Sequence, residues 1–329
     1  MITWHGLDEA GGLAAIPFFP DALETESRGF WLDAINPDAG ELKSLGAALR
    51  IDIPDRQDMA EIELSNRLYK DGDSLVMIAS LIPKAEEGRL PPTRPATFIF
   101  RDDLLITVRF CDFFSFERMV AEMAKNRQIN SATAVFFGLL EEMVSDRADG
   151  LERSMRRLEE LTAKLFLPSP EVKTVSPGGD DLAAVIKGIG ALGVEVSIIR
   201  ESIASLQRML NFAKAHLPVE RRSGMAGVMD SLKNDLTALA DEASFLMNKL
   251  SFNLDAALGM INLDETKVIR LLSVVTLILS PPLLIAGIYG MNFRHMPELG
   301  WEYGYLASLA LMLFTAVASI RYLRWRRWL

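Results

Sequence analysis

Two long stretches without a charged residue lie near the end of this sequence. The first runs from Leu271 to Tyr289 and the second from Tyr303 to Ile320. A helix of about 20 apolar residues crosses the roughly 30 Å of hydrocarbon in a bilayer. The two stretches therefore predict a helical hairpin in a membrane, with the second span reaching about residue 322, and they exclude a purely water-soluble protein.

Charge is distributed unevenly along the 329 residues. Up to Glu265 there are 28 Lys and Arg against 42 Asp and Glu, a balance of −14, whereas the last 64 residues have 7 against 2, a balance of +5; together they give the net −9. An acidic segment of this kind repels a phosphate backbone, so we expect no nucleic-acid partner. The single cysteine, Cys111, permits no internal disulfide, which fits a reducing cytosol.

The charges that flank the two apolar stretches predict their orientation. The connection between the stretches, residues 290–302, carries one basic residue and two acidic ones. Positive charge marks the cytoplasmic side of a membrane protein. We therefore expect both termini in the cytoplasm, the connection outside, and a multi-pass protein of the cell inner membrane in contact with lipid. The basic residues on the outer flanks are Lys267, Arg270, Arg321, Arg324, Arg326 and Arg327, the last three in a cytosolic tail, residues 323–329.

The soluble part is expected to have an α/β domain, residues 1–130, followed by long helices. Branched and aromatic runs predict strands, and a helix is expected over 54–69. The turn between the last two strands is expected at 101–103. The strands are expected over 30–35, 75–82, 97–100 and 104–110.

Beyond residue 130 the apolar spacing is helical. Residues 131–219 predict long cytosolic helices, over 132–165 and 182–216. After residue 220 no proline occurs before Pro281, so residues 220–289 are expected to form one stalk helix that continues into the first span.

Signatures of catalysis are weak. Gly188, Gly190 and Gly193 match a dinucleotide-binding motif, but the flanking sequence is helical on both sides and lacks the required strand. Small residues that let two helices approach closely explain this motif better. The sequence has no phosphate-binding loop, and its three histidines are scattered. We expect no enzyme and no organic cofactor.

Five small residues recur at every seventh position across the first membrane stretch. This heptad line can be explained by tight helix packing or by a path for ions that several copies surround. A two-helix hairpin cannot enclose water alone, so the second explanation requires an oligomer. The heptad line consists of Gly259, Thr266, Ser273, Ser280 and Gly287.

The sequence at the end of the first span resembles the CorA magnesium transporter family. Gly290-Met291-Asn292 follows the span directly, and Met296 to Leu299 (MPEL) precedes the second span. The segments 31–38 and 260–264 are also similar to the family. The resemblance implies a homopentamer with a funnel-shaped cytosolic portion, a pore lined by the first span, and transport of Mg²⁺, often with Co²⁺ or Ni²⁺. Arg294 departs from the pattern, since many relatives have an acid there.

The resemblance also implies site residues. Asn292, with Gly290 and Met291, would select the ion, although Asn is also common at the end of a helix. Leu272 would form an apolar constriction, unless it simply faces lipid or another helix. Glu298 would lie in the external loop. The residues expected to line the pore are Thr266, Leu272, Ser273, Thr276, Ser280, Leu283 and Gly287.

Regulation by cytosolic Mg²⁺ is implied as well, through acidic residues at subunit contacts. The candidates are Glu61, Asp230 and Asp235, each of which can equally be a solvated surface acid. Two other functions remain open: a transporter of zinc or another divalent cation with the same architecture, and a membrane-anchored scaffold that transports nothing.

Overall fold

The structure is a computed structural model that describes residues 2–7, 13–17, 29–60, 63–84, 90–166, 179–291 and 300–328. The chain divides into two compact units. The first contains Met1–Pro177 and Ala183–Asn253, and the second contains Gly178–Leu182 and Leu254–Leu329.

The first unit contains a sheet of seven strands in the order β2-β1-β3-β7-β6-β5-β4. All neighbours pair antiparallel except β3 and β7, which are parallel. The sheet is therefore mixed, as expected of an α/β domain. The strands are β1 (Ile2–Leu7), β2 (Leu13–Pro17), β3 (Gly29–Ile35), β4 (Leu68–Asp71), β5 (Ser74–Leu81), β6 (Arg94–Arg101) and β7 (Leu104–Arg109).

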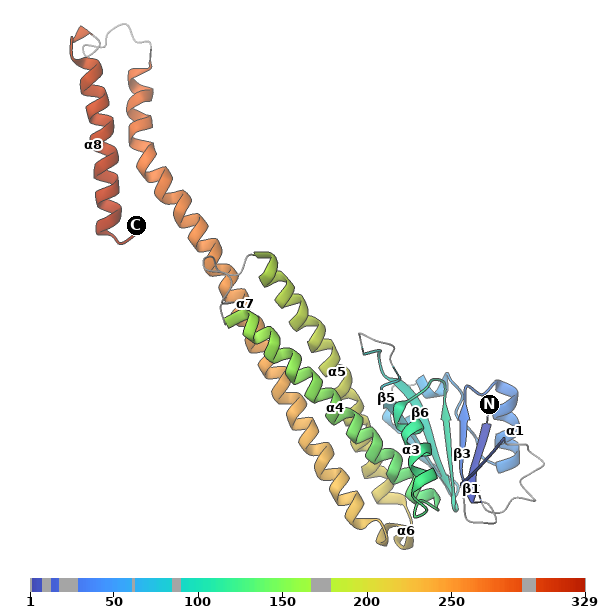
Figure 1. Ribbon diagram of the computed structural model, residues 1–329. Helices are drawn as coiled ribbons and strands as arrows, with labels where there is room; N and C mark the ends of the chain where they lie inside the picture. Colours follow the sequence, from blue (N-terminus) through green and yellow to red (C-terminus); the bar gives the residue numbers. More distant parts are fainter. Residues whose placement is uncertain are drawn as a thin grey trace. The chain divides into compact units, whose positions relative to one another are not determined.

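Helices cover both faces of this sheet (Figure 1). On one face α1 (Ala39–Leu49) buries Leu42, Leu45 and Leu49 against the strands. On the other face aromatic rings join the sheet to α3 (Phe114–Lys125) and to α4 (Ala132–Phe166). Because β3 and β7 alternate their side chains between two covered faces, they read as nearly continuous apolar runs.

Three long helices pack together in the first unit: α4, α5 (Gly179–His216) and the start of α7 (Ala226–Tyr289). Their buried residues alternate at spacings of three and four, the pattern of helices that interlock side chains with a left-handed supercoil. A Cβ at Gly188 of α5 would lie 2.9 Å from Leu161 of α4, so the helices approach closely there, whereas the other two glycines of that motif meet open space. In the part of α7 that belongs to this bundle the buried apolar residues are Met229, Leu232, Leu236, Leu239, Ala243, Leu246 and Leu250.

A few polar residues lie among the buried apolar residues between α4, α5 and α7. Arg147 of α4 is 4% exposed and donates from Nε to Ser202 Oγ of α5 at 3.0 Å; its burial lowers the pKa of its guanidinium to about 10, so it stays charged at neutral pH. Asn253 of α7 donates from Nδ2 to Thr162 Oγ1 at 3.0 Å, and its buried Oδ1 has no hydrogen-bond partner among the residues that the structure describes. Buried polar groups of this kind specify which residues of two helices face each other.

The sequence prediction holds for the four expected strands and for the long helices, but it needs two corrections. The segment 54–69 is not one helix: it contains a 3-10 turn at Asp58–Ala60, a short helix α2 (Leu64–Arg67) and the start of β4. Asp55 explains the first break, because its side chain accepts the backbone N–H groups of Gln57 and Asp58. The stalk helix begins at Ala226, after a separate α6 (Val219–Ser223), rather than at residue 220.

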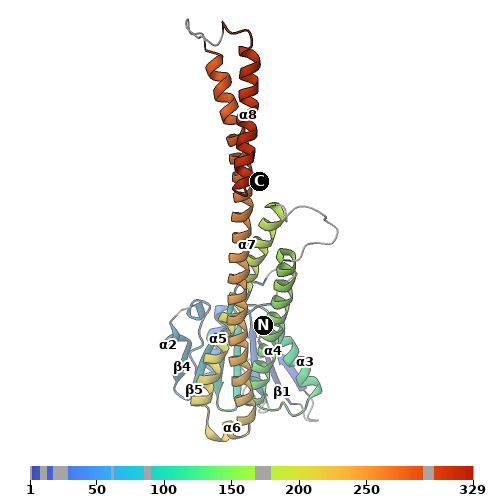
Figure 2. The ribbon, with the colours of Figure 1, turned by 90° about the vertical axis from the view of Figure 1, so that its left-hand side faces the viewer.

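The second unit is a helical hairpin. In Figures 1 and 2 helix α8 (Gly304–Trp325) runs antiparallel beside the last part of α7. Both helices are long and apolar enough to cross a membrane, and so is Leu182–His216 of α5. In α5, however, 39% of the most apolar window is buried, against 6% in α7 and α8, because its apolar residues form the seam of the three-helix bundle.

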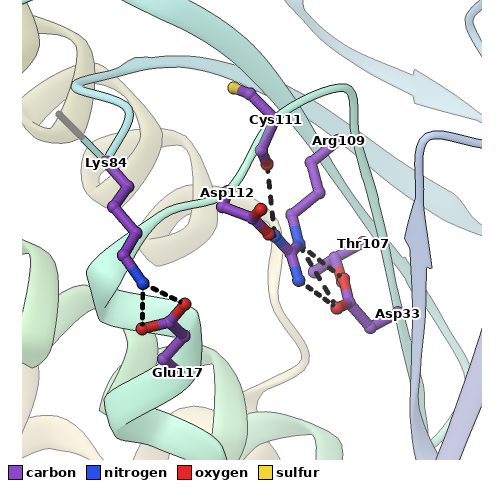
Figure 3. Close-up of polar contacts among 7 residues, drawn as sticks. All are labelled: Asp33, Lys84, Thr107, Arg109, Cys111, Asp112 and Glu117. Atoms are coloured by element: carbon purple, nitrogen blue, oxygen red, sulfur yellow. Dashed lines mark hydrogen bonds and ion pairs between the residues drawn. The ribbon is translucent and has the colours of Figure 1, made fainter. Parts of the chain in front are cut away.

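A buried ion pair lies at the parallel strand pair of the first unit (Figure 3). Arg109 of β7 bonds Asp33 of β3 at 2.8 Å, and both side chains are 9% exposed. Thr107 donates to Asp33 at 2.6 Å and accepts from Trp31 Nε1 at 3.0 Å. Arg109 also bonds Asp112 and the carbonyl of Cys111, so its charge is compensated on two sides.

Asp33→Ala should lower the free energy of unfolding of the soluble part by about 3–5 kcal/mol, because it leaves Arg109 buried without its main counter-charge. Lys84→Ala is the matched control: it breaks the Lys84–Glu117 pair shown in the same figure, whose side chains are 43% and 53% exposed, and should cost at most about 1 kcal/mol. Denaturant unfolding of the full-length protein, followed by tryptophan fluorescence, measures both. Equal losses of unfolding free energy in the two variants would show that the buried Asp33–Arg109 pair contributes no more to stability than an exposed pair.

Candidate ion pathway

Two opposite faces of α7 can be distinguished in the second unit. Val274 is buried, and Ile278, Pro281 and Ile285 are half-buried, at spacings of three and four. This face lies against α8, which runs beside it in both views (Figures 1 and 2). The seven residues expected to line a pore are all exposed in the single chain, and helical periodicity places them on the other side of α7.

Hydroxyl groups on this exposed face bond back to their own helix. Thr266, Ser273 and Thr276 donate their protons to the carbonyls of residues 262, 269 and 272, at 2.7, 2.8 and 2.8 Å. Each hydroxyl has one donor and two acceptor lone pairs. With the donors used inside the helix, the oxygens are left to accept, which suits them to a cation or to the water around it.

The end of the first span and the loop after it are described only in part. Helix α7 ends at Tyr289, and Gly290 N–H donates to Ala286 O at 2.9 Å. A Cβ at Gly290 would lie 3.1 Å from that same oxygen, so glycine fits this turn with the least crowding. Met291 is exposed. Asn292 and Glu298, the remaining predicted residues of this loop, lie outside the described residues.

Two prolines lie inside α7, Pro281 and Pro282. The helix continues through them, although neither has a backbone N–H to donate. The carbonyls of Leu277 and Ile278 therefore lack their usual partners four residues on. A membrane interior supplies no water to such carbonyls, so they need a neighbouring helix or a hydrated path.

The predicted regulatory acids are not brought together within one chain. Glu61 lies outside the described residues. Asp230 is paired with Lys214 at 2.7 Å, and this hydrogen bond and charge lower the pKa of Asp230. In the described part of the chain, no group of three or more His, Cys, Asp or Glu side chains could hold a metal ion.

Asp235 lies in an acidic neighbourhood that the sequence did not reveal. Burial, and then the charges of Glu142 and Asp235, raise the pKa of Glu141 on α4. These carboxylates come from two helices, α4 and α7. Spacing along one helix could not have predicted this grouping, because it depends on how the two helices pack.

The face of α7 against α8 was also missed. The small residues of the heptad line stand out from an apolar background, whereas Val274, Ile278 and Ile285 do not. The signal that could have found them is the spacing of three and four, applied to the branched residues alone.

The structure combines a soluble α/β unit, a 64-residue helix whose end can span a membrane, and a second apolar helix beside that end. These features define a class of membrane protein in which a membrane span continues a helix of the soluble part. The chain belongs to the CorA-like Mg²⁺ transporter family, whose model matches residues 26–326. Proteins of this family are membrane transporters, which bears out the resemblance noted in the sequence.

Individual members of the family are similar to this protein along nearly the whole chain. The magnesium transport protein CorA of Yersinia pseudotuberculosis is 28% identical over 313 residues, covering 94% of this chain and 95% of its own. The protein of the same name from Escherichia coli K12 is 28% identical over 303 residues, covering 91% and 92%. The complete structure of the CorA magnesium transporter from Methanocaldococcus jannaschii superposes with a TM-score of 0.77 at 19% identity, covering 98% and 97%.

The two faces of α7 predict a pattern of water access in the membrane. In a Cys111→Ser background, single cysteines at Ser273, Thr276 and Ser280 should react with a membrane-impermeant thiol reagent. Cysteines at Val274 and at Ile285 should be protected by α8. Labelling of the full-length protein in vesicles measures the difference, and equal labelling of both sets would show that the exposed face is covered by lipid or by tight packing.

Proposed function

We propose that this protein carries Mg²⁺ across the cell inner membrane through a pore that five copies surround, each copy contributing α7. The observation that carries the proposal is the exposed face of α7 away from α8, where the acceptor oxygens of Thr266 and Ser273 lie on the heptad line and that of Thr276 lies beside it. The family and its magnesium-transporting members support the choice of ion. Both termini lie in the cytoplasm in this proposal, and Co²⁺ and Ni²⁺ are further substrates.

The chemistry of Mg²⁺ suits such an entry. This cation sheds its water reluctantly and prefers oxygen in octahedral geometry at about 2.0–2.1 Å. A ring of Asn292 amides with Gly290 carbonyls would hold the ion by its outer water, firmly enough to select it and weakly enough to release it. Below this ring Leu272 forms an apolar constriction that closes when water leaves it.

Asn292→Ala should abolish or nearly abolish Mg²⁺ uptake while leaving assembly intact. The substitution removes the polar ring but little apolar packing, and the loss of a helix-end contribution of about 1 kcal/mol is small beside two spans and a long helix. Uptake into vesicles, read with a Mg²⁺-sensitive dye, measures the effect. Asn130→Ala, the same change at an exposed residue between α3 and α4, outside the proposed pathway, should transport like the parent.

The same assay separates the two rival functions. A zinc transporter of this architecture would carry Zn²⁺ faster than Mg²⁺ and would respond to a pH gradient. A scaffold would give no flux with any divalent cation. An assembled Asn292→Ala protein whose Mg²⁺ flux equals that of the parent would refute the role given to this residue.

We further propose that cytosolic Mg²⁺ closes the pore by bridging acids of neighbouring copies. Glu61 and Asp235 are the residues we assign to this bridge, because the acids around Asp235 repel one another and a bound divalent cation offsets that repulsion. Asp230 is a secondary candidate, since Lys214 already neutralises it within the chain.

The double variant Glu61→Gln/Asp235→Asn should lose most of the protection that Mg²⁺ gives the cytosolic part against protease. The physical reason is that no carboxylates remain at the proposed bridge. Digestion of the full-length protein with and without Mg²⁺ measures it. Glu152→Gln, which neutralises a surface acid paired with Arg156, is the control and should keep the protection.

A further inference from the structure

Helix α8 has a covered face and an uncovered face. Its covered residues recur at spacings of three and four and end at Leu323, which is 1% exposed. This face lies against α7, the helix that runs beside α8 in both views (Figures 1 and 2). Helical periodicity places Val317, Arg321 and Arg324 on the opposite face. The covered face includes Ser308, Met312, Thr315, Ser319 and Leu323.

The uncovered face is hollowed at the end of the span. The hollow has a volume of about 750 Å³ and is apolar on its side toward the middle of the helix. Toward the end of the helix its lining becomes basic and aromatic. The lining residues include Val317, Ala318, Arg321, Tyr322, Arg324 and Trp325.

The hairpin itself does not compensate the two arginines of this hollow. The last acidic residue of the chain is Glu302, 19 positions before Arg321. On α7, residues 264–270 carry two acids and two bases, and Asp264 is already paired with Lys267 at 2.7 Å. The end of α8 therefore has an excess of positive charge that attracts an anion from outside the hairpin.

The level of this charge along the helix selects a phosphate of the membrane. Leu313 and Val317, 67% and 54% exposed, form an apolar surface directly before Arg321 on the uncovered face. Such a surface suits an acyl chain, and the arginines follow one turn later, where the headgroups begin. Trp325 is 77% exposed, and an exposed tryptophan is typical of the headgroup level.

We propose that the end of α8 binds one anionic phospholipid of the cytosolic leaflet. Arg321 and Arg324 are three residues apart, so they are neighbours on the helix surface, and their guanidinium groups bind the lipid phosphate together. Val317 and the apolar surface before it contact an acyl chain. A zwitterionic lipid binds less tightly, because its own ammonium group compensates its phosphate.

Two further arginines lie outside this site. Arg326 follows the last residue of α8, and its Nε lies 3.5 Å from the Tyr322 hydroxyl oxygen. Arg327 has a left-handed backbone with φ of 57°, so the helix no longer positions its side chain. The inference rests on the proposed orientation of the hairpin and not on the pore.

Native mass spectrometry of the full-length protein in mild detergent, mixed with phosphatidylglycerol or phosphatidylethanolamine, tests the site. The parent should retain phosphatidylglycerol more strongly. Arg321→Gln/Arg324→Gln should weaken this retention by roughly tenfold or more, as expected for two arginines beside an anionic headgroup. Arg326→Gln/Arg327→Gln removes the same charge from the same tail and should keep most of the retention. Equal losses in the two variants would show diffuse attraction and overturn the site.

Two other variants preserve every positive charge around the span. Val317→Trp fills the hollow and should lower the retention of phosphatidylglycerol, whereas Leu309→Trp, a similar enlargement two turns earlier, should not. Arg321→Lys/Arg324→Lys keeps the charges that orient the span and should bind the lipid less tightly, because an ammonium lacks the paired donors of a guanidinium. Undiminished retention in both Val317→Trp and the lysine variant would contradict the proposed contacts.

Uptake of Mg²⁺ by the same protein in vesicles separates this inference from the proposed function. A protein that transports Mg²⁺ but retains both lipids equally overturns the lipid site and leaves transport standing. Selective retention of phosphatidylglycerol without any flux supports the lipid site and refutes the transporter.

Discussion

The alternation of three and four residues along the buried sides of α4, α5 and α7 is the constraint on which the rest of the structure depends. It fixes how α7 is rotated within the soluble unit, because Leu236, Ala243 and Leu250 must face the other two helices. Every outer position of α7 is then determined as well. The same helix has to be stable in water and in hydrocarbon, and only a helix satisfies its own backbone in both.

Much of the fold could be predicted from the sequence where one physical signal dominated. The two spans follow from length and hydropathy, and the long helices follow from their periodicity. The helix expected over 54–69 was wrong because local side-chain bonds of Asp55 and the pairing of β4 with β5 outweigh helical propensity there. Strands β1, β2 and β4 were missed, since they are short and β1 and β2 carry small or polar residues that give no clear alternation.

The residues of the candidate ion pathway could likewise be predicted from the sequence only in part. Small residues at every seventh position of an apolar run could be recognised without a structure. What periodicity could not supply is the partner of each face: that α8 lies against Val274, that Lys214 neutralises Asp230, and that Glu141 of another helix stands near Asp235. Each of these depends on contacts between segments distant in the sequence.

Asn253 has a mechanical consequence for the long helix. Its amide bonds Thr162 at one height of the bundle only. Sliding α7 along α4 by one heptad, about 10.5 Å, would preserve the spacing of the apolar residues but would carry this amide away from Thr162 and break its bond. The bundle therefore resists displacement of α7 along its axis, just as the apolar contacts resist its rotation, whereas a small tilt of the helix is opposed least. A signal that passes along α7 to the membrane is then expected as a tilt of this helix.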